Sequence, residues 1–445
     1  MNDTIAAIAT GQSVSAIGIV RISGPRALDA ARALFLPFPE TDRKLSYGKL
    51  HTADGKELLD ACMCTVSHAP NSYTGEDTAE FQCHGSPVLL AAVLEELFKC
   101  GVRQALPGEF TKRAFLNGKL QLADAEAVAD IIDAETVEGV KNAADQLTGA
   151  ISKKMNEAHS QMLDICAHFH AVLDYPDEDI EDFRIAAYQN TLHEIRDSFQ
   201  NMLNTYNRGR FLNTGIPAAI AGAPNAGKSS LLNALLGFER AIVTSVPGTT
   251  RDTIEEKIRI GGITLRLIDT AGMHEAADEI ERLGIERTQS AIGSAELIIR
   301  VVDGTADEAD SGFDFSSCGK KMITAVNKSD LPGFNRSLTE KLSPAVAVSA
   351  KTGEGIEELI KEIEKLFDGG KNTGGSLISN ARHAEALKTA VTYLDAALSA
   401  LGGGETPDIV LTELEGAINA IGLLTGASIT ADVTNRIFSR FCVGK

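Results

Sequence analysis

The chain has 445 residues, too many for one hydrophobic core, and this length predicts roughly two to four domains. With 44% hydrophobic and 23% charged residues, it has the composition of an ordinary soluble protein. A formal net charge of −19 argues against broad, non-specific binding to nucleic acid, although an RNA could be held at a local basic patch or presented by a partner.

Membrane and secretory classes are also disfavoured. No apolar run reaches the roughly eighteen residues of a membrane span, and the first residues lack the basic and apolar regions of a secretory signal. Among the seven cysteines, Cys62 and Cys64 are too close for a zinc pair and lie in an alternating apolar run that predicts a core strand. We therefore expect a reducing, cytoplasmic setting.

Residues 1–117 are predicted to form an α+β domain. Alternating or apolar runs predict strands at 14–22, 62–66 and 78–83, and helical spacing predicts helices at 26–35 and 88–98.

A helical region follows this domain. Apolar residues between Val140 and Val172 recur every three or four positions, so we expect one long helix, which ends at the proline-containing segment 174–178. A second helix is expected at about 185–208. After a glycine-rich linker at 369–375, helical patterning returns at 380–441, with a break at 402–404.

Residues 215–368 alternate between strand-like and helical runs, which predicts a mostly parallel sheet with helices on both faces. The expected strands are 217–221, 263–268, 297–302, 322–326 and 345–348. Because helical sequence flanks this unit on both sides, we expect it to be inserted at a loop tip of a discontinuous helical domain whose halves pack together. The predicted division is 1–117, 118–213, 214–370 and 371–445.

Residues 222–229 (GAPNAGKS) fit the phosphate-binding loop pattern G-x-x-x-x-G-K-[ST], between an apolar run and a helical run. Backbone N–H groups of such a loop point at the phosphates of a nucleoside triphosphate. Lys228 would reach the β- and γ-phosphates, and the Ser229 hydroxyl would bind Mg²⁺. The alternative is a glycine-rich strand-to-helix turn with a chance Lys-Ser.

Two further segments predict the remaining phosphate and magnesium contacts. Residues 269–272 (DTAG) follow a predicted strand, where Asp269 can hold Mg²⁺ through water and the Gly272 N–H can bond the γ-phosphate. Residues 248–252 (GTTRD) offer Thr250 as the second Mg²⁺ hydroxyl; the alternative is a helix-capping turn.

The base is predicted to be guanine. Residues 327–330 (NKSD) follow a strand, and the Asp330 carboxylate can accept hydrogen bonds from guanine N1–H and its 2-amino group, which adenine lacks. Residues 349–351 (SAK) end the next strand, where a backbone N–H can meet guanine O6. The order of these motifs predicts a GTP site.

The residue after DTAG is unusual. Many GTPases have a water-orienting glutamine there, but this chain has Met273, which cannot orient water. A carboxylate is the natural substitute, and four glutamates in the next segment are candidates: Glu275, Glu279, Glu281 and Glu286.

These motifs together resemble the TrmE–Era–Septin GTPases, and within them the MnmE (TrmE) family. The likeness covers nearly the whole chain. Outside the nucleotide motifs it includes 20–24 (VRISG), 73–77 (YTGED), 84–85 (HG), 107–117 (PGEFTKRAFLN), 122–126 (LADAE), 174–178 (DYPDE) and 441–445 (FCVGK), with Val443 where the family usually has isoleucine.

The resemblance implies a potassium ion that supplies the missing positive charge and promotes pairing of the nucleotide domains. The implied potassium ligands are Asn225, Thr244, Val246 and Thr249, and the implied water-orienting residue is Glu281. The implied catalytic residues are Glu281 and Lys228, with Cys442 as an open question. The full predicted GTP-binding set is Asn225, Ala226, Gly227, Lys228, Ser229, Ser230, Thr244, Ser245, Val246, Pro247, Gly248, Thr249, Thr250, Asp269, Thr270, Ala271, Gly272, Asn327, Lys328, Asp330, Ser349, Ala350 and Lys351.

The resemblance also implies that the N-terminal domain binds 5-formyltetrahydrofolate or a related one-carbon tetrahydrofolate and forms a homodimer. The matching folate contacts are Arg21, Glu80, Lys119 and Lys445. From its residue pattern alone, Arg21 would be a solvated charge on a strand. Cys442 is either an activated thiol or a small buried residue, and for His84 a turn is favoured over a site lining.

The implied function is a potassium-activated GTPase that works with a flavin-dependent (FAD) partner, MnmG (GidA). Together they would add a carboxymethylaminomethyl group to C5 of the wobble uridine (U34) of certain tRNAs. Two alternatives stay open: a regulatory or ribosome-assembly switch GTPase, and a GTP-regulated folate one-carbon transferase.

Overall fold

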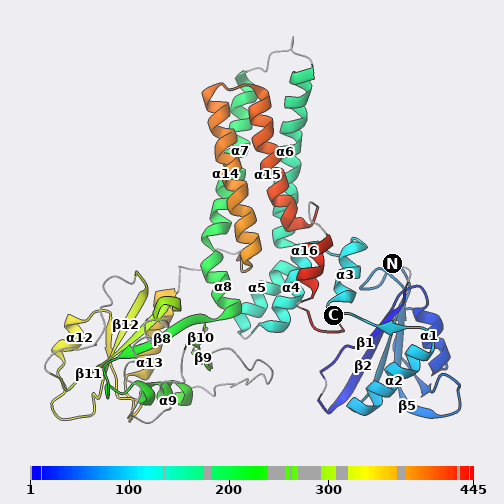
Figure 1. Cartoon of the computed structure of the whole chain (residues 1–445), viewed down its shortest axis with the longest axis horizontal. Coiled ribbons are helices and arrows are strands. Elements are labelled where there is room, and N and C mark those ends of the chain that lie inside the picture. Colours follow the sequence, from blue (N-terminus) through cyan, green and yellow to red (C-terminus); the bar gives the residue numbers. More distant parts are fainter. Residues whose placement is uncertain are drawn as a thin grey trace. The chain divides into compact units, whose positions relative to one another are not determined.

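The computed structural model describes residues 3–11, 13–134, 136–174, 182–238, 256–260, 263–268, 292–306, 319–367, 377–427, 431–439 and 441–444. The chain divides into two compact units. Figure 1 labels the helices and strands that they contain. The first unit is Met1–Ala129, Ala144–Arg196 and Thr389–Lys445, and the second is Asp130–Ala143 and Asp197–Lys388. The mixture of an α+β region, helices and an α/β region is the predicted fold class; the predicted four-part boundaries stay a prediction.

The N-terminal region of the first unit is a seven-stranded sheet in the order β3-β4-β5-β6-β2-β1-β7. All neighbouring strands are antiparallel except β1 and β7. The strands are β1 (Ile5–Ile8), β2 (Ser15–Ser23), β3 (Phe35–Leu36), β4 (Ser46–His51), β5 (Leu58–Ser67), β6 (Thr78–Gly85) and β7 (Arg103–Gln104). Two predicted helices are also present, as α1 (Ala27–Leu34) and α2 (Pro87–Lys99).

Strand β5 shows why the alternating pattern predicted this sheet. Because successive side chains of a strand point to opposite faces, Asp60, Cys62, Cys64 and Val66 share one face, and all four are buried. The phenyl rings of Phe35 and Phe81 stack in the same core.

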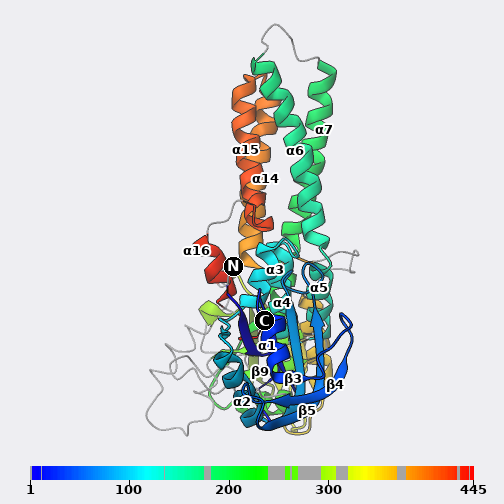
Figure 2. The same cartoon turned by 90° about the vertical axis from the view of Figure 1, so that its right-hand side faces the viewer.

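Four long helices run side by side in both views (Figures 1 and 2). They are α6 (Ala150–Asp174), α7 (Asp182–Asn204), α14 (Ala381–Gly403) and α15 (Pro407–Thr425). Arg196 of α7 pairs with Asp395 of α14 at 2.8 Å, and His170 of α6 lies 3.5 Å from Glu415 of α15. Helices from before and after the nucleotide region therefore pack together, as predicted.

Two predicted helix limits are wrong. The apolar stripe from Val140 to Val172 belongs to α5 (Val137–Leu147) and α6, because Gly149 takes a left-handed φ of 82° between them. The second helix runs to Asn204 and is followed by α8 (Tyr206–Thr214). Thr205 separates them: its hydroxyl donates to Met202 O and accepts from Ile378 N.

Three helices join the C-terminal segment to the N-terminal region within the first unit. They are α3 (Glu109–Leu116), α4 (Leu122–Asp133) and α16 (Ala431–Phe438). Phe438 and Phe441 pack against Leu122 and Ala125, and the Gly108 N–H donates to Cys442 O at 3.3 Å. A side chain at Gly108 would come within 2.5 Å of Phe438 O, so this close approach requires glycine.

A buried charge network holds α3. The Arg113 side chain is 1% exposed and donates to Asp3, Glu76 and Glu109, and Arg103 donates to both Asp3 and Glu109. Burial opposes ionisation of Glu109, but hydrogen bonds from Arg103, the Leu106 N–H and Arg113 outweigh it and lower the pKa of this carboxyl.

The second unit contains a six-stranded sheet in the order β13-β12-β11-β8-β10-β9. It is parallel except for β9 beside β10, as the alternating pattern predicted for the most part. The strands are β8 (Ile216–Gly222), β9 (Glu256–Ile260), β10 (Ile263–Leu267), β11 (Leu297–Asp303), β12 (Lys321–Asn327) and β13 (Ala345–Ala347). Helices α9 (Lys228–Phe238) and α13 (Ile356–Phe367) pack on one face, and Ile292 and Ala295 on the other; the short α12 (Ser337–Lys341) precedes β13. None of the helices in the described part of the chain combines the length and apolar character that a membrane span needs.

Candidate functional site: a guanine nucleotide pocket and an N-terminal charged site

The phosphate-loop motif lies between β8 and α9, as the sequence predicted. Gly222 ends β8 where a side chain would come within 2.2 Å of Val301 O, so only glycine fits. Asn225 and Gly227 have left-handed φ values of 62° and 97°, which turn the chain into α9. The loop therefore meets a helix N-terminus, where backbone N–H groups attract phosphate.

Lys228 is half-buried, and its Nζ donates to Gly222 O and Ala223 O at 3.0 Å each. Burial lowers the pKa of this ammonium group because the charged form is desolvated. A phosphate at the loop would offer a charge-assisted hydrogen bond and would restore the preference for the charged form. This arrangement fits the predicted role of Lys228.

Asn327 joins the phosphate loop to the segment 349–351, which is predicted to recognise guanine. Its Nδ2 donates to Ala226 O at 2.9 Å, and its Oδ1 accepts from the Ala350 N–H at 3.0 Å. A side chain at Gly227 would come within 2.1 Å of Asn327 Nδ2, so that glycine makes room for this amide. The amide thus braces the pocket, a role that the motif alone did not reveal.

Asp330 and Lys328 are each positioned by a neighbour. Ser349 Oγ donates to Asp330 Oδ1 at 2.7 Å, which orients the carboxylate predicted to read guanine. Lys328 Nζ lies 2.6 Å from Asp303 Oδ2. Burial opposes ionisation of Asp303, but hydrogen bonds from Lys328 and Thr305 prevail and lower its pKa.

The sequence analysis missed Asp303. The available signal was its place at the carboxyl end of β11, in a parallel sheet whose strand ends carry the site.

Several predicted residues lie outside the described residues. They are Thr244, Ser245, Val246, Pro247, Gly248, Thr249, Thr250, Asp269, Thr270, Ala271, Gly272, Met273, Glu275, Glu279, Glu281, Glu286 and Lys445, together with the predicted linker at 369–375. The described part of the nucleotide site brings together 222–230, 327–330 and 349–351.

A second group of predicted residues meets in the first unit. Arg21 and Glu80 are opposite each other on β2 and β6, and Arg21 Nε donates to Glu80 Oε1 at 2.7 Å. The guanidinium also lies 5.7 Å from the ring centres of Tyr73 and Phe110, and one of its nitrogens donates to Gly444 O at 3.4 Å. Interpreting Arg21 as a solvated charge is therefore wrong.

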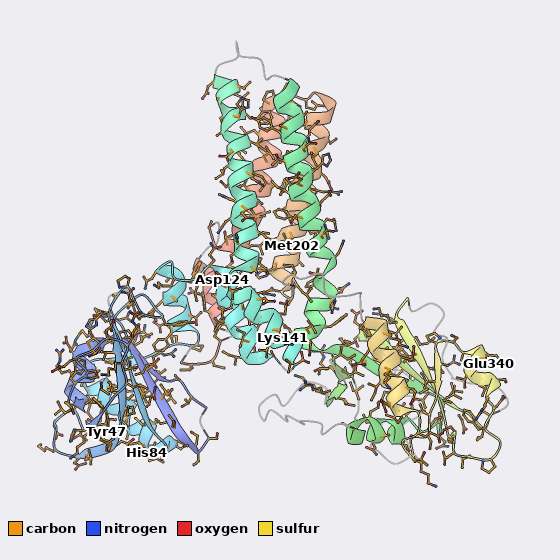
Figure 3. All side chains as sticks on the ribbon, turned by 180° about the vertical axis from the view of Figure 1, so that it is seen from behind. Tyr47, His84, Asp124, Lys141, Met202 and Glu340 are labelled. Atoms are coloured by element: carbon orange, nitrogen blue, oxygen red, sulfur yellow. The ribbon has the colours of Figure 1, made fainter. Side chains whose placement is uncertain are left out.

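Three other predicted residues have clear positions. Lys119 Nζ donates to Pro70 O at 3.0 Å, on the segment that leads to Tyr73. Cys442 is exposed, so the buried-residue interpretation is wrong. His84 (labelled in Figure 3) lies in β6 rather than in a turn, because the pairing with β2 continues to Gly85. Its ring Nδ1 lies 2.7 Å from Asp60 Oδ1.

Comparisons with known proteins cover the whole chain. The profile of the MnmE helical domain matches residues 122–442, and that of the GTP-binding protein TrmE N-terminus matches residues 4–119. The tRNA modification GTPase MnmE of Acetivibrio thermocellus is 39% identical over 100% of this chain and 99% of its own length. The corresponding proteins of Carboxydothermus hydrogenoformans (41%, 100% of both chains) and Akkermansia muciniphila (40%, 99% of both chains) are similar. These matches over the full length show that this chain belongs to the MnmE (TrmE) family of GTPases.

Proposed function

We propose that this GTPase takes part in modification of the wobble uridine (U34) of certain tRNAs, adding a carboxymethylaminomethyl group to C5 together with the flavin-dependent protein MnmG (GidA). The observation that supports this proposal most strongly is full-length similarity to proteins named tRNA modification GTPase. Hydrolysis of GTP would drive opening and closing of the nucleotide domains rather than the carbon chemistry.

Potassium activation is the second part of the proposal. Ser229 and Thr250 would bind Mg²⁺, while Asn225, Thr244, Val246 and Thr249 would hold K⁺ in place of an arginine finger. Asn225 is exposed on the phosphate loop in a left-handed conformation, which fits a ligand directed away from the core. Replacing K⁺ with Na⁺ should lower the hydrolysis rate about tenfold or more. An equal rate in both salts would contradict this part.

Glu281 is proposed to orient the attacking water in place of the missing glutamine. Glu281→Ala should retain GTP binding and reduce turnover about 10²-fold, the effect of losing a group that positions the transition state. Glu279→Ala is the matched control and should leave turnover nearly unchanged. If instead Glu279→Ala lost turnover and Glu281→Ala kept it, Glu279 would be the residue that orients the water.

A one-carbon tetrahydrofolate is proposed to bind at Arg21, Glu80, Lys119 and Lys445, where it would supply a one-carbon unit. The residues fit because Arg21, half-buried near two aromatic rings, lies 2.7 Å from Glu80. The two side chains would therefore meet the same end of the ligand, with the guanidinium as a donor and Glu80 as an acceptor for the pterin. Such a ligand would compete with Glu80 for Arg21. Homodimerisation through the N-terminal domain completes the proposal.

Mass analysis of tRNA nucleosides tests the proposal as a whole. Cells lacking this chain should lose the modification at U34, and the wild-type gene should restore it while Lys228→Ala should not. Normal uridine modification in the deleted cells would instead favour a switch GTPase without a part in modification.

A further inference from the structure

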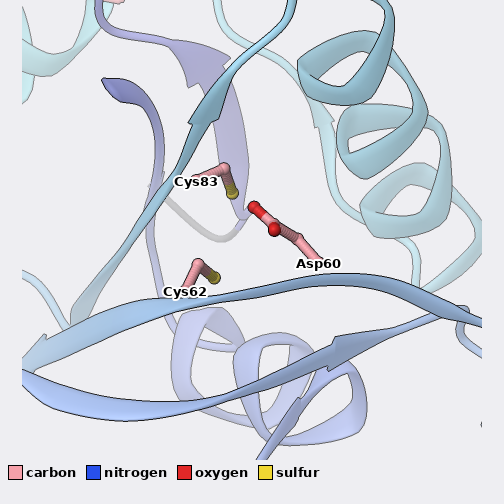
Figure 4. Close-up of side chains that lie close together, drawn as sticks. All are labelled: Asp60, Cys62 and Cys83. Carbon is pink, nitrogen blue, oxygen red and sulfur yellow. The ribbon is translucent and has the colours of Figure 1, made fainter. Parts of the chain in front are cut away.

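Three potential metal ligands meet between β5 and β6, and none of them belongs to either site described above. Ligand atoms of Asp60, Cys62 and Cys83 all lie within 4.8 Å of one another. The β5–β6 register pairs Met63 with Gln82, so the next pair along is Cys62 and Cys83. Figure 4 shows both sulfur atoms and the Asp60 carboxylate converging on one point.

The cluster combines burial with negative charge. Asp60, Cys62 and Cys83 are 9%, 5% and 2% exposed, and both cysteines belong to the apolar core of the sheet. Burial opposes ionisation of Asp60, but hydrogen bonds from the His84 N–H, the His84 ring and the Ala61 N–H lower its pKa. The contact with Cys62 and burial raise the pKa of the Cys83 thiol. The Asp60 carboxylate therefore faces two sulfur atoms in a largely apolar region, an arrangement that a cation would stabilise.

We propose that Asp60, Cys62 and Cys83 bind one thiophilic divalent cation, with zinc as the expected metal. Two sulfur donors and one carboxylate oxygen form a ligand set that zinc accepts, and water would complete the tetrahedron. Each thiol loses its proton to solvent on binding, so two protons are released per metal ion. The ion joins strands β5 and β6 across the sheet.

His84 has the place of a residue that orients a ligand. Its Nδ1 lies 2.7 Å from Asp60 Oδ1, and its backbone N–H donates to Asp60 Oδ2 at 2.9 Å. Metal-binding carboxylates are commonly held by hydrogen bonds of this kind. Sequence spacing concealed the site because its two cysteines come from different strands, whereas Cys62 and Cys64 are the pair that are close in sequence.

Two simpler explanations account for less of the geometry. A disulfide between Cys62 and Cys83 would use both sulfur atoms but would give no role to the carboxylate. Packing of small residues explains the cysteines but not why a buried carboxylate lies within 4.8 Å of both sulfur atoms. The three donors together favour a metal.

Cobalt substitution tests the proposal on the full chain. The protein is stripped of metal, reduced with a phosphine, and titrated with Co²⁺ in excess Mg²⁺, which occupies the oxygen-ligand site of the nucleotide loop. One equivalent of Co²⁺ should give a thiolate-to-cobalt charge-transfer band and intense tetrahedral visible bands, and Zn²⁺ should remove both. Cys62→Ser and Cys83→Ser should lose the charge-transfer band. Cys64→Ser, two residues along the same buried face, should keep it.

Further readouts separate the site from a general effect on folding. His84→Ala should weaken binding about 10–100-fold without removing the charge-transfer band. The wild-type titration needs no variant, so a charge-transfer band with one Co²⁺ per chain supports the proposal even if a serine variant fails to fold. A folded, reduced wild-type chain with no charge-transfer band would overturn the proposal. It would also be overturned if Cys64→Ser lost the band to the same extent as Cys62→Ser and Cys83→Ser. A chain that binds no Co²⁺ but forms a Cys62–Cys83 disulfide on oxidation would identify a redox pair instead.

Discussion

At the scale of single residues, the nucleotide pocket depends on atoms that the motif patterns do not name. Gly227 leaves the space that Asn327 uses to brace the phosphate loop. Gly227→Ala should weaken binding of a fluorescent GTP analogue about 5- to 150-fold, because alanine is strained at this φ and displaces the amide, at a cost of about 1–3 kcal/mol. Gly237→Ala, where a side chain meets open space in α9, should leave binding unchanged.

Asp330 is predicted to select guanine, and this prediction can be tested by substitution. Asp330→Asn should weaken GTP binding about 10–100-fold, because a charged acceptor worth about 1.5–3 kcal/mol is lost. Xanthosine triphosphate, which has a carbonyl in place of the 2-amino group, should bind the variant better than it binds the wild type. If calorimetric titration showed that the variant binds both nucleotides more weakly by the same factor, the substitution would have damaged the loop rather than changed its base selectivity.

At the scale of elements, strands and helices could be predicted from the sequence where the apolar residues follow one regular spacing. The alternation in β5 and the apolar strands β8 and β11 were found because burial on one or both faces leaves a regular pattern. The prediction of one long helix was wrong because the apolar stripe continues across Gly149. A stripe of apolar residues does not show whether the helical backbone is continuous. Asp303 and the Asp60–Cys62–Cys83 cluster were missed because their partners are distant in sequence.

The break between α5 and α6 at Gly149 can be tested by its effect on the free energy of unfolding. Gly149→Ala should lower the free energy of unfolding by about 1–2 kcal/mol, since alanine resists the left-handed conformation although its side chain has room. Gly402→Ala, in the last turn of α14 where the backbone is not left-handed, should instead raise stability by about 0.4–1 kcal/mol. Urea denaturation of both variants measures the difference, and effects of the same sign would contradict the assigned break.

The charge network around Arg113 predicts acid sensitivity. Because the pKa of Glu109 is lower in the folded chain than when unfolded, its contribution is complete above the ordinary glutamate range and is lost as the pH falls toward the lowered value. The free energy of unfolding should therefore be higher for the wild type than for Glu109→Gln near neutral pH. Urea denaturation at a series of pH values should show this difference becoming smaller as the pH falls. A gap that is constant with pH would show that ionisation of Glu109 does not contribute.

At the scale of the whole molecule, residues 441–444 complete the N-terminal site. Cys442 contributes its backbone carbonyl to Gly108, while its side chain is exposed. Cys442→Ser should therefore change the free energy of unfolding by no more than about 0.5 kcal/mol. If the thiol is chemically active, the same variant should lose U34 modification in cells while retaining GTP hydrolysis. Normal modification would assign the segment a purely structural role.

The hydrogen bond from Arg21 to Gly444 joins positions 423 residues apart, which has a consequence for biosynthesis. During translation the sheet that carries Arg21 emerges long before its partner segment has been made. A nascent or prematurely ended chain can therefore present a folded nucleotide region and yet lack a finished N-terminal site. The N-terminal site can therefore be completed only after the ribosome has synthesised the chain through Gly444.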